Sequence, residues 1–333
     1  MAWRSRAVVV AAVISLVATA CGGDDTDDGA GGPTTTAAGT STSATTDDTG
    51  TEPTRLSVVA EDFSFSGAPE QVEAGVFAIT FENAGAVEHE LAFVEIGDTP
   101  LDEVGGAIAP TLEGGPFPDF LENLAIPAVA EPGQTVETTA LLAEGNYALI
   151  CTLTGAVPEP GATTTTGGGG GPEEGPQGPP HHELGMIQPF TVTTSSNPLT
   201  LPANDSAITA RDYDFDVRIS AGPQTVNFVN EGPDQVHHGV FFAFNEGVDE
   251  TAAEAALLAF ASSEEEAPPP PELDLPTSET LPHTGVFSSG LGATYEMDFQ
   301  SGRTYAVVCF IQDRSGGPPH LVAHDMKEIF TVQ

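Results

Sequence analysis

Histidine, cysteine and methionine recur in the same order in two parts of the chain. Seven of the eight histidines fall in this pattern: His89, His181, His182, His237, His238, His320 and His324. Each part supplies an early histidine, then Cys151 or Cys309, then a later histidine and a methionine. Two imidazoles and a thiolate in one plane, with a weak thioether above it, are the ligands of a blue-copper site. The pattern therefore predicts two sites for a redox-active copper ion.

The pattern belongs to a longer internal repeat. The matching segments are Ala60–Phe65 with Ala210–Phe215, Asn83–Gly85 with Asn230–Gly232, Gly145–Cys151 with Gly302–Cys309, and the closing Phe190–Val192 with Phe330–Val332. Two copies of this length indicate duplicated domains rather than a solenoid.

Short apolar runs recur at the same places in both copies. Val76–Phe81 and Thr225–Val229 are rich in β-branched and aromatic residues, and Tyr147–Leu153 and Tyr305–Ile311 follow a glycine turn. Such runs, bounded by Gly, Pro and Asn, are typical of strands. We expect an all-β fold of two tandem Greek-key β-sandwich domains.

Composition sets the expected boundaries. We expect a signal peptide over 1–20, a disordered tether over 21–53, a first domain over 54–193, a linker over 194–205 and a second domain over 206–333.

Other segments depart from the strand pattern. Helices are expected at Leu101–Ile108 and Thr251–Ser262, both as insertions in a sandwich. The Gly-, Thr- and Pro-rich stretch Gly161–Gly178 and the acidic, Pro-rich stretch Ser263–Pro276 are expected to be unstructured.

The N-terminus has the features of an export signal. Arg4 and Arg6 precede an apolar stretch over Ala7–Ala18, and small residues lead to Cys21. This arrangement is typical of a secretory signal peptide, and its apolar core is shorter than the roughly 20 residues of a membrane-spanning helix.

Cys21 is the expected point of attachment to the membrane. Its position resembles the bacterial lipobox, although Ala18 stands where that motif usually has Leu. The Gly-, Ser-, Thr- and Asp-rich sequence that follows is typical of a flexible spacer. We expect an extracytoplasmic protein anchored to the cell membrane by a lipid on Cys21; the alternative is an ordinary signal peptide with an incidental cysteine.

The chain is strongly acidic. Its formal net charge is −41, with only 8 lysines and arginines among 333 residues. This composition excludes the basic surface of a nucleic-acid-binding protein. It also disfavours electrostatic docking on an anionic membrane, so membrane contact is expected through the lipid.

These motifs resemble those of the cupredoxin family, specifically plastocyanin-like domains of exported bacterial proteins. The Asn-x-Gly then His, the Tyr-x-x-x-Cys after a Gly turn, and the closing His, Met and Phe-Thr-Val carry the resemblance over Thr54–Thr193 and Ser206–Gln333. It implies copper ligands at His89, Cys151, His181 and Met186, and at His238, Cys309, His320 and Met326. His182 remains an alternative to His181, and His237 to His238.

The resemblance implies single-electron transfer or copper holding, with a redox partner protein. Well-studied members separate Cys from the second His by only a few residues, whereas 29 residues intervene between Cys151 and His181, and 10 between Cys309 and His320. The shorter loop costs about 1 kcal/mol less to order. We therefore expect the second domain to bind copper better.

Three alternatives compete with this interpretation. Cys151 and Cys309 could form a disulfide, which requires Cα atoms within about 7 Å, or could be inert core residues. The function would then be that of a metal-free binding module at the cell surface. A copper oxidase or nitrite reductase is disfavoured because the chain has no His-x-His pair and no histidine beside either cysteine. We therefore expect no enzymatic activity.

The lipid anchor predicts the behaviour of Cys21→Ser. Without the acceptor thiol, the protein should leave the membrane fraction for the medium, or stay uncleaved, as fractionation would show. A variant that is cleaved normally yet remains membrane-bound until detergent is added would refute lipidation.

Overall fold

A computed structural model describes residues 52–155, 178–195, 200–262 and 268–333. The predicted signal peptide, Cys21 and nearly all of the predicted tether lie outside these residues, as do 161–177 of the predicted unstructured segment. Among the residues described, no helix is long and apolar enough to cross a membrane.

The first repeat contains nine strands in two sheets. They are β1 (Thr54–Glu61), β2 (Ser64–Ser66), β3 (Gln71–Glu73), β4 (Gly75–Asn83), β5 (His89–Glu95), β6 (Leu124–Ala130), β7 (Thr135–Leu142), β8 (Gly145–Ile150) and β9 (Ile187–Thr193). One sheet has the order β7-β4-β1-β2 and the other the order β6-β5-β8-β9-β3. β1 and β4 run parallel, as do β3 and β9.

The second repeat copies much of this arrangement. Its strands are β10 (Ser206–Arg211), β11 (Asp214–Arg218), β12 (Gly222–Asn230), β13 (Val240–Ala243), β14 (Val286–Phe287), β15 (Gly292–Phe299), β16 (Thr304–Val308) and β17 (Lys327–Thr331). One sheet has the order β11-β10-β12-β15, the other β13-β16-β17, and β10 runs parallel to β12 as β1 does to β4. The predicted all-β sandwich is confirmed.

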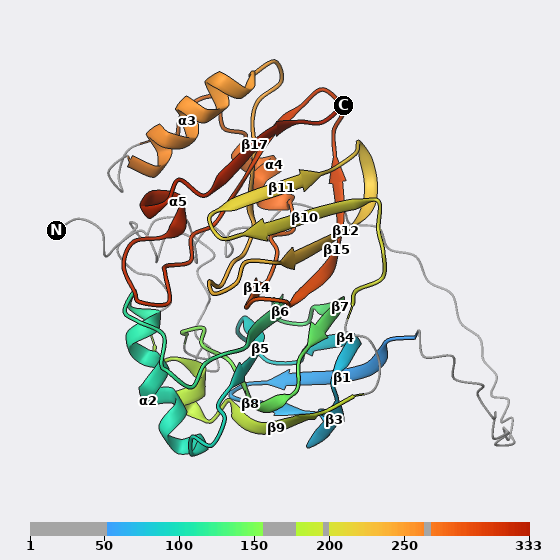
Figure 1. The fold of residues 1–333 in the computed structure, drawn as a ribbon, viewed down its shortest axis with the longest axis vertical. Coiled ribbons are helices and arrows are strands. Elements are labelled where there is room, and N and C mark those ends of the chain that lie inside the picture. The colour runs from blue at the N-terminus through green and yellow to red at the C-terminus, as the bar shows by residue number, and fades with distance from the viewer. Residues whose placement is uncertain (1–51, 156–177, 196–199, 263–267) are drawn as a thin grey trace, which may run out of the picture.

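The two repeats are joined edge to edge. β15 pairs with β7 through Ala293 and Ala140, so that a single eight-stranded sheet runs through both repeats. β14 pairs with β6 in the same way on the other sheet. Figure 1 shows the repeats stacked along the long axis, with these strands at their junction.

The central strands are buried on both faces. In β5, Leu91 and Phe93 belong to the core between the sheets, whereas Ala92 and Val94 belong to a second core under a helix. In β13, Phe241 belongs to the core between the sheets and Phe242 to another core under a helix. These strands therefore lack the polar alternation of a half-exposed strand.

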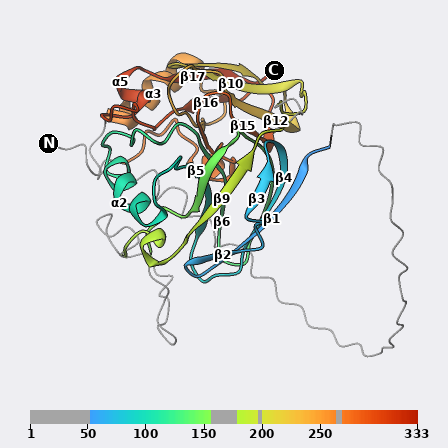
Figure 2. The ribbon, with the colours of Figure 1, turned by 60° about the horizontal axis from the view of Figure 1, so that its bottom comes forward.

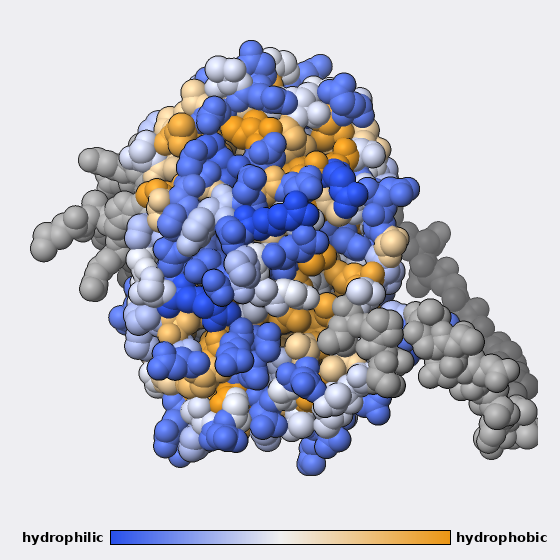
Figure 3. All heavy atoms as spheres, in the orientation of Figure 1, coloured by the Kyte–Doolittle hydropathy of each residue, from blue (hydrophilic) through white to orange (hydrophobic). Residues whose placement is uncertain are grey.

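Helices supply the outer covers. α2 (Leu101–Leu112) covers the first repeat, and α3 (Glu250–Ser262) covers the second. Both are where helices were expected. Together with the one-turn α5 (His320–Ala323) they lie on the same side of the molecule in two views (Figures 1 and 2). Figure 3, in the orientation of Figure 1, shows a face that is mainly hydrophilic, with apolar residues in several places.

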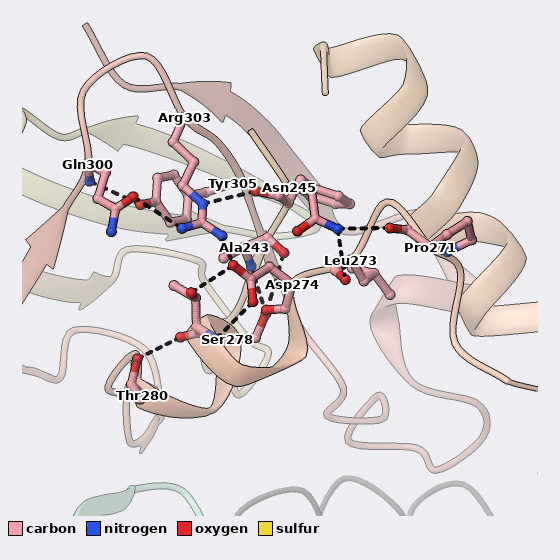
Figure 4. A network of polar contacts seen from close by, with 12 residues as sticks. Ala243, Asn245, Pro271, Leu273, Asp274, Ser278, Thr280, Gln300, Arg303 and Tyr305 are labelled. Carbon is pink, nitrogen blue, oxygen red and sulfur yellow. Dashed lines mark hydrogen bonds and ion pairs between the residues drawn. The ribbon is translucent and has the colours of Figure 1, made fainter. Parts of the chain in front are cut away.

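One part of a segment expected to be unstructured is ordered. α4 (Leu275–Thr280) begins inside the predicted Ser263–Pro276 stretch. Asp274 caps it by accepting a hydrogen bond from Thr277 N–H, and Pro276 lies in the first turn, where proline is compatible with a helix. Asp274 also pairs with Arg303, whose Nε donates to the Phe244 carbonyl (Figure 4).

A buried asparagine holds the turn before the early histidine in each repeat. Asn83 is fully buried; its amide donates to the carbonyls of Val87 and Ala130 at 2.8 and 2.7 Å, and its carbonyl accepts from Gly85 N–H. Asn230 makes the same three kinds of bond in the second repeat.

Asn83→Ala should lower the free energy of unfolding by about 2–3 kcal/mol, because one buried and one partly buried carbonyl lose their donor. Urea unfolding would measure the change. The control, exposed Asn146→Ala, should stay within about 0.5 kcal/mol of wild type. An equal effect of the two substitutions would contradict the assigned role.

Candidate metal centres

The early histidine lies at the start of the strand that follows the asparagine turn. His89 is the first residue of β5 and is fully buried. In the second repeat, His237 occupies the corresponding place, where it exchanges two backbone hydrogen bonds with Phe287. It is also fully buried.

The cysteines immediately follow the central strands β8 and β16. Cys151 and Cys309 are fully buried and free, so the disulfide alternative is excluded. Backbone amides point at each sulfur: Glu90 N–H donates to Cys151 Sγ at 3.4 Å.

The closing segment is fastened to the cysteine in the same way in both repeats. His181 N–H donates to the Leu153 carbonyl, Met186 N–H to the His181 carbonyl, and Cys151 N–H to the Met186 carbonyl. The corresponding bonds in the second repeat join His320 to Ile311, Met326 to His320 and Cys309 to Met326. The late histidine is thus placed by the cysteine strand despite the different loop lengths.

In the first repeat, three potential ligand atoms form a compact triangle. His89 Nδ1 lies 3.1 Å from His181 Nδ1, and Cys151 Sγ lies 3.9 and 3.4 Å from these two atoms. A point equidistant from all three is about 2 Å from each, close to the length of metal–imidazole bonds. The residues therefore fit a metal ion.

The second repeat forms the same arrangement. Cys309 Sγ lies 3.8 Å from His237 Nδ1 and 3.4 Å from His320 Nδ1. In each repeat all three ligand atoms lie within 4.8 Å of one another.

Both predicted methionines are buried next to the cysteines. Met186 and Met326 are fully buried, and their carbonyls accept the Cys151 and Cys309 amides. A methionine beside the cysteine would supply the weak thioether donor of a copper–thiolate site.

Position distinguishes the two candidate histidines in each repeat. His181, rather than His182, faces Cys151 Sγ, whereas His182 Nδ1 lies 3.3 Å from the Cys151 carbonyl. In the second repeat the prediction of His238 is corrected: His237 faces Cys309 Sγ.

The error in the second repeat came from the flanking residues. Aligning His238 with His89 pairs Val240 and Phe242 with Leu91 and Phe93 of the inner face, but Val240 and Phe242 lie on the outer face under α3. Because both faces are apolar, a shift of one residue leaves the pattern unchanged while moving every side chain to the other face.

His238 has a different role, which Glu90 performs in the first repeat. Each follows the early histidine and accepts the backbone amide of the residue after the cysteine: Thr152 N–H donates to Glu90 Oε1 at 2.7 Å, and Phe310 N–H to His238 Nε2 at 2.9 Å. Both side chains thus orient the cysteine strand.

A carboxylate lies behind one imidazole of each site. Asp62 Oδ1 is 3.6 Å from His89 Nε2, and Asp313 Oδ1 is 3.4 Å from His320 Nε2. Carboxylates in this position orient metal-binding histidines. The sequence did not identify either carboxylate as a partner of a site histidine. Asp62 comes directly after β1, and Asp313 lies in the loop between Cys309 and His320.

The second site carries an additional polar network. Tyr213 O–H donates to Asp313 at 2.8 Å, and the Tyr213 ring stacks on His324 at 3.6 Å. Phe63 occupies the equivalent position in the first repeat, where it contacts His181 edge-on.

Comparisons with known proteins were made for sequence and structure. No protein-family model and no curated protein matches the chain. Similar solved structures include reduced auracyanin from Roseiflexus castenholzii, with 21% identity, 42% of this chain and 97% of that chain covered, and a TM-score of 0.26. Another is auracyanin A from Chloroflexus aurantiacus, described as a "blue" copper protein, with 22% identity, coverage of 43% and 100%, and a TM-score of 0.26.

A third similar structure is a copper nitrite reductase from Nitrosomonas europaea, with 14% identity, coverage of 85% and 94%, and a TM-score of 0.21. The assignment of the fold rests on the strand order of this chain and on its two histidine–cysteine–histidine triangles. The fold is cupredoxin-like.

Burial sets the protonation states of both cupredoxin-like sites. It lowers the pKa of His181 and His320 to about 4 and that of His237 to about 3, with charge repulsion from the neighbouring imidazole lowering the pKa of His181 and His237 further. It raises the pKa of the Cys309 thiol to about 12, and that of Cys151 also rises. The imidazoles are therefore neutral at pH 7, and metal uptake displaces a proton from each thiol.

These shifts predict the acid stability of the metal-free protein. Seven histidines have a lowered pKa: His89, His181, His182, His237, His238, His283 and His320. Between about pH 6.5 and 4 the unfolded chain takes up protons that the folded chain does not, so acidification should destabilise the fold. We expect the melting temperature to fall by more than about 5 °C from pH 7 to 4.5.

Glu88 opposes this trend, because burial raises its pKa to about 7. Between the ordinary glutamate pKa and pH 7, the folded chain binds a proton on Glu88 that the unfolded chain does not. This group therefore stabilises the fold increasingly as the pH falls through that range. Glu88→Gln should therefore steepen the decline. A melting temperature that is constant or rises on acidification would contradict the assigned histidine environments.

Proposed function

We propose that the chain is an extracytoplasmic, membrane-anchored copper protein that transfers single electrons or holds copper through two blue-copper-type sites. The supporting observation is the buried triangle of two Nδ1 atoms and one Sγ, present twice at equivalent places. The proposed anchor rests on the export signal and Cys21.

The histidine and cysteine side chains of both candidate sites are buried and shielded from water. Copper, when bound, supplies the one-electron couple. The closing-segment hydrogen bonds hold the cysteine and the late histidine of each site in place, and the carboxylates of Asp62 and Asp313 lie 3.6 and 3.4 Å from one ring nitrogen in each site. Because these ligand side chains are already oriented, they would move little when a bound copper ion gained or lost an electron.

Access for a redox partner is supported by exposed apolar side chains beside the late histidines. Leu184, three residues after His181, is 41% exposed, and Val322, two residues after His320, is 46% exposed. Both histidines are themselves fully covered. A partner docking here would approach each site without opening it to water.

Copper titration tests the proposal. Cu(II) added to freshly reduced wild type should give an intense visible thiolate-to-copper band, because a soft thiolate donor is bound. Cys309→Ser should remove most of this band, and Cys151→Ser less of it, since the second loop is shorter and costs about 1 kcal/mol less to order.

The double substitution is the matched control and should show no such band. A visible band in the double variant would place the copper elsewhere. A colourless wild type would favour the metal-free binding module instead.

A further inference from the structure

The loop that carries the second site's late histidine is docked on the first repeat. Three hydrogen bonds join it to backbone atoms of the end of α2 and the segment after it: Gln312 Nε2 donates to the Thr111 carbonyl at 2.8 Å, Gly317 N–H to the Gly114 carbonyl at 3.1 Å, and Phe117 N–H to the Arg314 carbonyl at 2.8 Å. Figure 1 shows the chain before α5 reaching the end of α2. Ten residues separate Cys309 from His320, so these contacts occupy the middle of the ligand loop.

Arg314 is the centre of this contact. Its guanidinium donates to the carbonyls of Leu121 and Glu122 at 2.5 and 2.8 Å and lies over the Phe117 ring. An arginine offers five N–H donors in a fixed planar arrangement, so it can satisfy several carbonyls at once.

Arg314 also reaches the segment before the early histidine. Its Nε donates to the Asp234 carbonyl at 2.6 Å, and its backbone N–H donates to Gln235 Oε1 at 2.9 Å. Gln235 lies two residues before His237 and its carbonyl accepts from the buried Asn230 amide. One side chain thus joins the early-ligand segment, the late-ligand loop and the first repeat.

The contact is tight as well as polar. Gly316 has φ +81°, and a Cβ added there would lie 2.8 Å from Gly115 C and Pro116 N, which are backbone atoms of the first repeat. A backbone this close cannot be displaced by rotating a side chain. The two segments of the chain therefore fix each other's position.

We infer that residues 111–122 of the first repeat position the metal-ligand loop of the second site, with Arg314 as the positioning residue. This inference rests on the proposed function for the identity of the metal, but the positioning of the loop is independent of it. Second-site copper binding would then depend on a part of the chain that supplies none of its ligands.

The test uses the full chain carrying Cys151→Ser, so that only the second site contributes. Arg314→Gln removes the guanidinium contacts. Its matched control is Arg303→Gln, which breaks another partly buried arginine network at the opposite end of β16 (Figure 4). Arg314→Gln should weaken copper affinity, measured by chelator competition, by about 10- to 100-fold, as for other residues that orient ligands. Arg303→Gln should lower stability but leave affinity within about twofold of the parent, because it does not reach the loop.

A second pair separates docking from backbone strain. Gly316→Ala and Gly302→Ala both place a side chain at a left-handed φ, +81° and +76°, but a Cβ at Gly302 meets nothing within 4 Å. Gly316→Ala should reproduce the loss of affinity, and Gly302→Ala should not.

Hydrogen exchange of the metal-free protein supplies a readout without copper. The amides of His320 and Leu321 donate to the Ile311 and Cys309 carbonyls. Their exchange should accelerate at least about tenfold in Arg314→Gln and Gly316→Ala, relative to the two controls. Unchanged exchange, or equal acceleration in the controls, would overturn the inference. Faster exchange in a protein that binds no copper would support the positioning and reject the proposed metal function.

Discussion

Each repeat buries two imidazole rings and a thiol at one end of its sandwich, and polar groups in such a place need partners. The thiol of the first repeat and the main chain around it find theirs among backbone amides and carbonyls. Cys151 receives the Glu90 amide on sulfur, while its own amide is bonded to the Met186 carbonyl. Consequently the early strand, the cysteine strand and the closing segment cannot shift independently. The imidazoles differ, because the Nε2 atoms of His89, His181, His237 and His320 are buried without a hydrogen-bond partner among the described residues, while their Nδ1 atoms converge on the sulfur.

The repeat made much of this predictable. The strands that lead to the cysteines and the order of the late histidines follow from motifs that recur in both copies. The parallel pairing at the start of each copy appears only in the structure. The position of His181 beside Cys151 is visible only in the structure, since the bond from its amide to the Leu153 carbonyl is a main-chain contact between residues far apart in sequence. No side-chain pattern encodes it.

The choice between His237 and His238 failed for a related reason. Periodicity distinguishes the two faces of a strand only when one face is polar. Here α3 covers the outer face, so Val240 and Phe242 are as apolar as Phe241. The carboxylate behind each site was equally hidden: Asp62 follows a strand of its own repeat, whereas Asp313 comes from the ligand loop. The two repeats thus share one ligand geometry but differ in the residues that support it.

The joining of β7 to β15 has a consequence for solubility. In each repeat taken alone, β7 or β15 would be the edge strand of its sheet, with unpaired amides and carbonyls along one side. Ala140 and Ala293, which face each other there, are both fully buried, so the uncovered edge would also be apolar. Such an edge is a template for adding strands from other molecules. The pairing of Ala140 with Ala293 and of Thr139 with Thr294 covers this part of both edges, which should lower the tendency of each repeat to associate with other copies.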